Sequence, residues 1–270
     1  MITIMYEGEI RNQGDTVIIR TIPTLTISDY QKGQKLSYER PESTALELLI
    51  DKGKYFSFVC DDIDKKQADI KLLNTWSDDA AEQMKIAVDY QLLTQVTYGT
   101  AGTFPGAAAN TGLTAGAISS SFNVGTAAAP VQITKANVLE YIIDAMTILD
   151  EQNVPESGRW MVIPSWMANL IKKSDLKDAS LTGDGTSVLR NGRIGMIDRA
   201  TLYLSNNLYN SSSVYYIPFG TNHGITFASQ MTKMESLRAE STFGDLVRGL
   251  NVYGFEVIKP EALGLICAKK

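Results

Sequence analysis

Apolar and polar residues alternate in several short runs near the start of the chain, with the period of two that is typical of β-strands. Four runs fit this pattern: 16–22, 34–38, 44–50 and 55–60. In the last two runs the apolar residues fall on one side of the predicted strand, and that side must be covered by other apolar atoms. The polar stretch 28–35 is typical of an exposed turn. The sequence therefore predicts a long antiparallel arm.

The next pattern repeats every three to four residues, as in a helix. Over 77–98 one side of the predicted helix is apolar and the other is largely charged. The apolar positions are Ala81, Met84, Val88, Leu92 and Val96. Acidic residues at the start of this segment suit the positive end of the helix dipole. At about 1.5 Å per residue the helix would be about 33 Å long, enough to form the spine of a domain.

The middle of the chain alternates between helix and strand patterns. The segment 99–130 is rich in Gly, Ala, Ser and Thr, which predicts a long loop. A helix is expected from Thr134, as a candidate N-cap, until Pro155 prevents its continuation. Two shorter elements follow, a strand at 159–163 and a helix at 165–173. Such alternation is typical of a mixed domain with a central sheet.

The last third of the chain predicts strands joined by polar turns. The stretch 174–193 is polar and contains glycine, which indicates a loop. The next predicted strands are 200–204, 214–218, 225–228 and 231–237. At the C-terminus, the strand-forming residues of 249–258 precede a final apolar run at 263–268. Pro260 between them cannot donate to a ladder, so these two segments predict a hairpin that packs on a core.

The composition is that of an ordinary soluble protein with one large or two small domains. Of the 270 residues, 44% are apolar and 20% are charged. The formal net charge of −5 argues against a protein whose affinity comes from neutralising nucleic-acid phosphates. No apolar run approaches the roughly 18 residues that a membrane span needs, and the N-terminus becomes charged too early for a signal peptide.

Residues able to carry chemistry are few. His223 is the one histidine and lies between two predicted strands, so a solvated or capping role is expected. The acidic cluster at 61–64 lacks the glycine of a calcium loop and is expected to start a helix. Cys60 and Cys267 have no metal-binding spacing around them, so buried free thiols in a reducing cytoplasm are expected. The sequence predicts no catalytic, metal or cofactor site.

The most distinctive segment runs from Phe243 to Leu263 and reads FGDLVRGLNVYGFEVIKPEAL. It resembles the C-terminal end of tailed-bacteriophage major capsid proteins with the Hong Kong 97 fold. Four segments look in order like their counterparts in the coat proteins of podovirus and siphovirus heads: 15–17, 55–64, 154–164 and 247–250. The resemblance covers nearly the whole chain.

The resemblance implies an α+β, Hong Kong 97-like capsid fold with three parts. These are a peripheral domain with a spine helix and long β-strands, an axial domain with a central sheet and helices, and an extended β-hairpin loop. The implied ranges are a short N-terminal arm at 1–15, the extended loop at 16–60, the peripheral domain with its Gly/Ala-rich excursion at 61–133, the axial domain at 134–237, and C-terminal peripheral strands at 238–270. Family members usually carry a longer N-terminal arm, so this arm is either naturally short or trimmed.

The implied function is structural: subunits form the hexamers and pentamers of an icosahedral tailed-phage head around double-stranded DNA. The extended loop would lie over a neighbouring subunit, and its charged residues would set the register: Arg20, Asp29, Lys32, Lys35, Glu39 and Arg40. The loop at 174–193 would surround the centre of each capsomer, and 238–248 would meet neighbours near three-fold positions. The interface candidates there are Asp184, Arg190, Arg193, Arg238, Glu240, Asp245 and Arg248.

The implied partners are copies of the chain itself, together with scaffolding, portal and cement proteins, and no membrane. The expected location is the virion, after assembly in the bacterial cytoplasm. Two alternatives stay open. An encapsulin-like shell protein shares the fold but encloses cargo enzymes, and a hydrolase using His223 is the third and least supported hypothesis.

Overall fold

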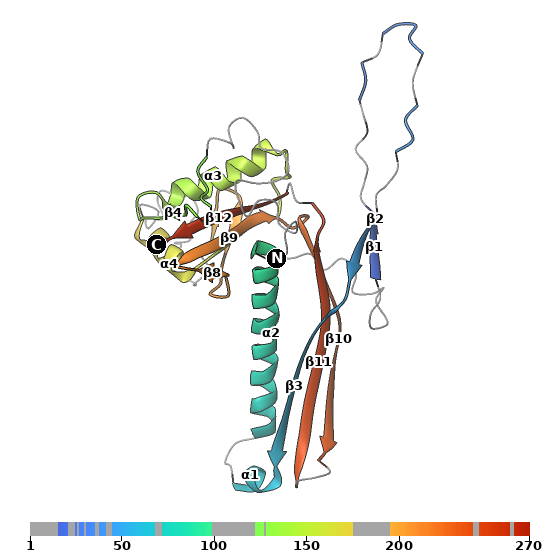
Figure 1. Cartoon of the computed structure of the whole chain (residues 1–270), viewed down its shortest axis with the longest axis vertical. Helices are drawn as coiled ribbons and strands as arrows, with labels where there is room; N and C mark the ends of the chain where they lie inside the picture. The colour runs from blue at the N-terminus through green and yellow to red at the C-terminus, as the bar shows by residue number, and fades with distance from the viewer. Residues whose placement is uncertain are drawn as a thin grey trace.

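The computed structural model describes residues 16–20, 25, 27–29, 31–35, 38–41, 45–67, 72–98, 122–126, 128–174, 195–239, 243–259 and 262–270. In these ranges the chain forms four helices and three separate sheets. Figure 1 shows them as a long body built on one sheet, a compact body built on another, and a two-stranded ribbon that leaves the long body at one end. The fold is therefore mixed α+β, as predicted.

The long body is an antiparallel sheet with a helix along one face. Its strands are β10 (Ile225–Arg238), β11 (Gly244–Val257) and β3 (Lys52–Asp61), in that order across the sheet. Helix α2 (Leu72–Tyr98) runs beside them (Figure 1), and its 27 residues correspond to about 40 Å of helix. The short helix α1 (Asp62–Gln67) joins β3 to α2. We call this sheet the long sheet.

Helix α2 packs on the long sheet through the side that the sequence predicted. Val88 and Leu92 are buried there. The Tyr253 hydroxyl of β11 donates a hydrogen bond to Gln91 Oε1 at 2.6 Å. The Phe58 ring of β3 meets the α2 indole of Trp76 edge-on, with ring centroids 5.8 Å apart. The spine helix is therefore confirmed, although it begins at Leu72, five residues earlier than predicted.

The compact body is built on a seven-stranded sheet. The strand order is β4 (Val131–Gln132), β12 (Leu263–Lys269), β9 (Val214–Thr221), β5 (Arg159–Ile163), β7 (Ala200–Leu204) and β6 (Met196–Ile197), with β8 (Asn210–Ser211) paired to β9. The helices α3 (Val138–Glu151) and α4 (Ser165–Lys173) belong to the same body. The bounds of β5, α4 and β7 are those that the sequence predicted.

Helix α3 supplies one side of the main hydrophobic core. Its buried residues are Val138, Ile142, Ala145, Met146, Ile148 and Leu149, and they share one cluster with Met161, Phe219 and Ile266 of the sheet. The helix begins four residues after Thr134, so the predicted N-cap is wrong. The reason is a preceding turn, in which the Thr134 amide donates to Asn137 Oδ1 at 2.6 Å and the Val138 amide donates to the Thr134 carbonyl.

Some strands belong to a different sheet from the one that the predicted domain ranges imply. The final run, β12, lies in the seven-stranded sheet and not beside β11. Its residues are buried on both faces: Leu263, Leu265 and Cys267 point to one cluster, and Ile266 and Ala268 point to another. A strand without polar alternation needs a sheet that is covered on both sides, and the long sheet is not.

Strand β10 also departs from the prediction. The sequence suggested two strands within the axial range, and the structure has one strand of 14 residues in the long sheet. Its register with β11 shifts between Gln230 and Lys233, as at a β-bulge. A bulge breaks the apolar alternation without ending the strand, which explains why the pattern indicated two elements.

The ribbon consists of β1 (Thr16–Arg20) and β2 (Ala45–Leu49), which pair antiparallel, and of the residues between them. A turn at residues 32–33 lies where the sequence predicted one, and the Gln34 amide donates to the Gln31 carbonyl. The strand predicted at 34–38 is wrong at its described residues, since Gln34, Lys35 and Tyr38 are not in a strand. Among the described residues of the predicted arm, strand pairing is found at its base, in β1 and β2. Strand β3, assigned to the arm from the sequence, belongs to the long sheet.

Candidate assembly surfaces

The far part of the ribbon carries apolar side chains that are open to solvent. Ile27 is 93% exposed and Tyr38 is 90% exposed, and Leu25 is also exposed. In Figure 1 the described segments between β1 and β2 extend beyond these two strands, away from both bodies. Isolated exposed apolar residues are common, but three on one thin projection offer a surface for another molecule.

The base of the ribbon is covered within the same chain. Leu48 and Ile50 are buried against Ala228 of β10 and Val252 of β11. The sequence predicted that other apolar atoms cover this side of β2, and the chain itself supplies them; this part of the implied extended loop is not left for a neighbouring subunit to bury. The physical reason is that β2 lies against β11, so the alternating residues of β2 face the chain's own sheet.

The alternation in β3 has the same explanation. Phe58 and Cys60 lie on the face of the long sheet that meets α2, where Phe58 touches Trp76 and Cys60 is buried. Tyr55 and Val59, which alternate with these residues along β3 and point to the other face, are exposed. The apolar side of β3 is therefore covered by the spine helix, and no described element covers the other face of the sheet.

That open face holds a groove, which we call the outer groove. It has a volume of about 520 Å³ and is lined by Tyr55, Phe56, Ser57, Lys233, Glu235, Leu246, Arg248, Gly249 and Leu250. All three strands of the long sheet contribute to it. Apolar side chains with a few charged groups on a long open face suit an extended segment of polypeptide better than a small ligand.

The charges of the outer groove are organised around Glu235. Arg248 Nε lies 2.9 Å from Glu235 Oε2, and Lys233 Nζ lies 2.7 Å from Glu235 Oε1. Hydrogen bonds from Lys233 and Arg248 lower the pKa of the Glu235 carboxyl to about 2. The groove therefore has two cations for one carboxylate, a net positive charge at its centre.

The far end of the long sheet carries a second ion-pair group. Arg238 Nη1 lies 3.0 Å from Asp62 Oδ1 and 3.3 Å from Asp245 Oδ1. The hydrogen bond that the Arg238 guanidinium donates to the Asp62 carboxylate raises the pKa of the guanidinium. Beside these charges, Phe243 and Ile63 are exposed. The tip of the long sheet thus presents apolar side chains next to charges that are already paired in the chain.

The predicted interface residues fall into three groups. Along the ribbon, Asp29, Lys32, Lys35, Glu39 and Arg40 are exposed, and Arg20 lies in β1 opposite Ala45. On the long sheet, Arg238, Asp245 and Arg248 take part in the ion pairs described above. The remaining four lie outside the described residues: Asp184, Arg190, Arg193 and Glu240.

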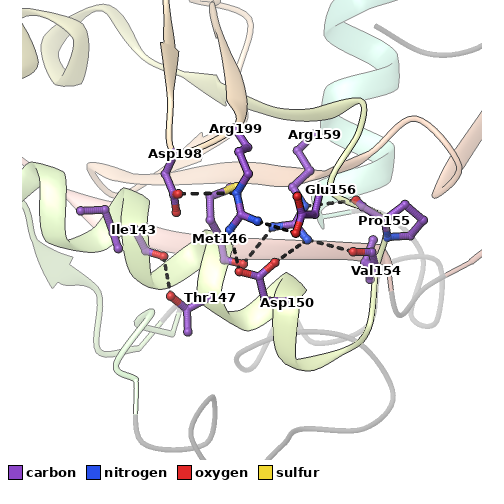
Figure 2. Close-up of polar contacts among 10 residues, drawn as sticks. All are labelled: Ile143, Met146, Thr147, Asp150, Val154, Pro155, Glu156, Arg159, Asp198 and Arg199. Carbon is purple, nitrogen blue, oxygen red and sulfur yellow. Dashed lines mark hydrogen bonds and ion pairs between the residues drawn. The ribbon is translucent and has the colours of Figure 1, made fainter. Parts of the chain in front are cut away.

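A buried ion-pair network supports the compact body, and the sequence did not predict it. The Arg159 side chain of β5 is fully buried and its Nη2 lies 2.6 Å from Asp150 Oδ1 at the end of α3. Arg159 also donates to three carbonyls, of Val154 at 2.8 Å, Pro155 at 3.2 Å and Met146 at 3.3 Å. Figure 2 shows these bonds converging on the guanidinium.

Arg199 extends this network to the turn between β6 and β7. Its Nη2 lies 2.9 Å from Asp150 Oδ2, and its Nη1 lies 2.8 Å from Glu156 Oε1, as Figure 2 shows. Asp198 and Arg199 both have positive φ, 44° and 66°, as a tight hairpin turn requires. The network therefore fixes the end of α3, the turn after it, and the hairpin that follows residues 175–194. A single arginine in the apolar strand sequence RWMVI was the one signal for it.

The described residues offer little for catalysis. His223 is exposed in the turn between β9 and β10, and no cluster of three or more potential metal ligands occurs in the described part of the chain. Cys60 and Cys267 are buried and free, as predicted, and burial raises the pKa of the Cys267 thiol to about 11. Among the described helices, none has the length and apolar character needed to cross a membrane.

Comparison with solved structures gives the class of the protein. A structure of Mycobacterium phage Che8 matches 98% of this chain over 88% of its own, with a TM-score of 0.72 and 25% identity. The capsid of cyanophage P-SCSP1u matches with a TM-score of 0.68 and 13% identity, covering 100% of this chain and 93% of its own. The capsid of a native gene transfer agent particle, GTA, matches with a TM-score of 0.62 and 13% identity, covering 97% and 86%. The chain has the fold of phage capsid subunits.

The sequence comparison narrows this class to one family. A family model described as phage capsid protein matches residues 46–266, and the chain belongs to that family. It is the major capsid protein of a tailed-phage head, a structural component of the virion and not an enzyme. No curated protein sequence matches it. The resemblance predicted from the sequence is therefore confirmed, and the hydrolase alternative at His223 is wrong.

Proposed function

We propose that copies of this chain form hexamers and pentamers that tile an icosahedral shell around double-stranded DNA, and that each ribbon lies in the outer groove of a neighbouring copy. In this proposal the long sheet with α2 is the peripheral domain and the seven-stranded sheet with α3 and α4 is the axial domain. The observation that carries the proposal is that the ribbon has an exposed apolar tip while the outer groove is left open by the described residues of the same chain.

The geometry supports an exchange between copies. In Figure 1 the ribbon extends beyond one end of the long sheet, and β3, β10 and β11, whose residues line the outer groove, run from that end in the opposite direction. A ribbon that entered the groove of its own chain would have to reverse at its base, where Leu48 and Ile50 are buried. A neighbouring groove needs no such reversal. Full burial of Ile27 or Tyr38 would contribute about 1.5–3 kcal/mol for each side chain.

Charge supports the same arrangement. The two cations and one carboxylate at the centre of the outer groove favour an incoming carboxylate. On the ribbon, Asp29 and Glu39 are exposed acidic residues on either side of the turn. Lys32, Lys35 and Arg40 are nearby and would be repelled by Lys233 and Arg248, so the charges select one register of the ribbon in the groove.

The enclosed DNA is held by containment in this proposal. With a formal net charge of −5, the subunit does not gain affinity from phosphate neutralisation. Scaffolding, portal and cement proteins are the further partners that we propose, and residues 174–193 are proposed to surround the centre of each capsomer.

The test compares two variants of the full chain that each lose exposed apolar side chains. The ribbon variant is Ile27→Ser with Tyr38→Ser, and the control is Ile143→Ser on α3, where Ile143 is 48% exposed and lies outside the ribbon and the groove. Assembly is followed by sedimentation velocity and electron microscopy. We expect the control to form particles and the ribbon variant to stay unassembled with an unchanged circular dichroism spectrum. Equal particle yields from both variants would contradict the proposal.

A further inference from the structure

Helix α2 has a second face, which points away from the long sheet and is exposed. Along it, Asp79, Gln83, Ile86 and Tyr90 recur at alternating intervals of four and three residues. This is the spacing of the contact positions of a coiled coil. Ile86 is 46% exposed and Tyr90 is 51% exposed. We call these four residues the α2 seam.

The seam is separate from the face that packs on the long sheet. At 3.6 residues per turn, Ile86 lies about 160° around the helix from the buried Val88. In Figure 1, α2 has the long sheet on one side, and no described element runs along its other side. The outer groove lies across the sheet from α2, so a molecule at the seam would not compete with a ribbon in the groove.

The charges beside the seam are mainly acidic. Glu82 and Asp89 are seven residues apart and flank it on the same side, and Asp79 lies within it. In coiled coils such flanking positions choose the partner through charge pairs. Partial desolvation raises the pKa of the Asp89 carboxyl. Lys85, three residues after Glu82 and four before Asp89, is the one cation on the same side of the helix over these positions.

These charges disfavour several occupants. A second α2 helix would bring carboxylates against carboxylates, and DNA phosphates would be repelled in the same way. In the sequence, residues 99–121 contain no lysine or arginine, and residues 1–15 contain Arg11 against three acidic residues. Those segments lack the charge that the seam would attract. The binding partner that complements the shape and the negative charge of the α2 seam is a cationic helix from another protein.

We propose that the α2 seam docks an amphipathic α-helix of a second protein, with apolar residues at three-four spacing flanked by lysine or arginine. Ile86 and Tyr90 would supply the apolar contact, and Glu82 and Asp89 would pair with the flanking cations. This partner site goes beyond shell formation, because copies of the chain assemble through the ribbon and the outer groove. The α2 seam thus gives the subunit a binding surface for a helical protein, and this surface is separate from the ribbon and the outer groove through which the subunits contact one another.

The probe is a fluorescein-labelled synthetic helix of about four heptads with leucine at the contact positions and lysine at the flanking positions. A matched peptide carries glutamate in place of every lysine. Binding to the unassembled full chain is measured by fluorescence anisotropy. Two test variants are compared with the unchanged protein: Ile86→Ala with Tyr90→Ala, and Glu82→Lys with Asp89→Lys. The control is Ile143→Ala, which removes an isoleucine of similar exposure on α3.

We expect the lysine peptide to bind saturably, and each test variant to raise its Kd by at least about tenfold while the control leaves the Kd unchanged. The glutamate peptide should bind only the variant with reversed charges. Circular dichroism and sedimentation establish that each variant is folded. The proposal is overturned by equal binding of both peptides, by binding that is insensitive to all the variants, by absence of saturable binding, or by a seam-dependent dimer of the chain itself.

Discussion

Replacing Arg159 by methionine should destabilise the subunit much more than the same replacement of Arg199. Both arginines pair with the same carboxylate, that of Asp150. They differ in environment, because the Arg159 side chain is 0% exposed and the Arg199 side chain is 40% exposed. The pair of variants therefore separates the effect of burial from the effect of losing a charge.

The expected magnitude follows from the bonds that Arg159 makes. Three carbonyl oxygens lose their charged donor, and removing one partner of a buried ion pair costs about 3–5 kcal/mol. Asp150 keeps Arg199 as a partner and is partly exposed, which places the expected loss near the lower end, about 3 kcal/mol. Methionine retains most of the buried aliphatic volume, so the change measures the polar bonds rather than a cavity.

The assay is equilibrium unfolding of the unassembled subunit in guanidinium chloride, with thermal unfolding as a second readout. A loss of about 3 kcal/mol corresponds to a drop in Tm of roughly 6–12 °C for a chain of this size. The Arg199→Met variant should show a much smaller change, since exposed ion pairs contribute little. An equal or larger loss in Arg199→Met, or a loss below about 1 kcal/mol in Arg159→Met, would refute the assignment of Arg159 as the buried anchor.

Three further predictions concern the sheets and the thiols. Gly254→Ala should destabilise the chain by about 1–3 kcal/mol and make the ribbon more sensitive to limited proteolysis, because a Cβ there would lie 2.2 Å from the Leu49 carbonyl oxygen; unchanged cleavage would count against the contact of β2 with β11. The lowered pKa of Glu235 makes its contribution to stability complete above pH 4.5 and lost as pH falls toward about 2, so Glu235→Gln should flatten the pH dependence of unfolding in that window, and parallel curves for the two proteins would speak against the pairing. Cys60 and Cys267 should resist alkylation at pH 8 until the chain unfolds, because both are buried and the pKa of Cys267 is raised to about 11; rapid modification of the folded protein would be inconsistent with that burial.

Elements with a strong local period were predictable from the sequence. The bounds of β5, α4 and β7 are as predicted, because each is a short run with clear turn residues or proline beside it. The apolar side of α2 was also identified, since a helix that covers a sheet must repeat its apolar residues every three to four positions. The exposed tip of the ribbon followed from its polar, turn-forming residues.

The choice of partner for each strand was not predictable. The alternation of Leu48 and Ile50 showed that one side of β2 is buried, but the same pattern fits burial in the chain or between copies, and the structure shows the former. The pattern of β10 was broken by its bulge, and β12 was placed with the wrong sheet because proximity in sequence suggested a hairpin with β11. Long-range pairing depends on what covers both faces of a strand, which no local period encodes.

The candidate surfaces were likewise predictable from the sequence only in part. Arg238 and Arg248 were identified as interface residues from the resemblance, and the structure adds that each is held by acidic residues of its own chain. The outer groove combines residues of β3 with residues of β10 and β11, which lie far from β3 in the sequence, so no local motif predicted it. The three-four spacing of the α2 seam is present in the sequence, but the apolar pattern of the buried face of α2 is stronger and was the one that the sequence analysis identified.

A high-resolution electron cryomicroscopy reconstruction of the assembled particle tests the central claim most directly. The account predicts rings of six and five subunits in which Ile27 and Tyr38 of one copy lie in the groove formed by Tyr55, Leu246 and Leu250 of the next. A particle whose ribbons contact only their own subunits, with the grooves open to solvent, would contradict it.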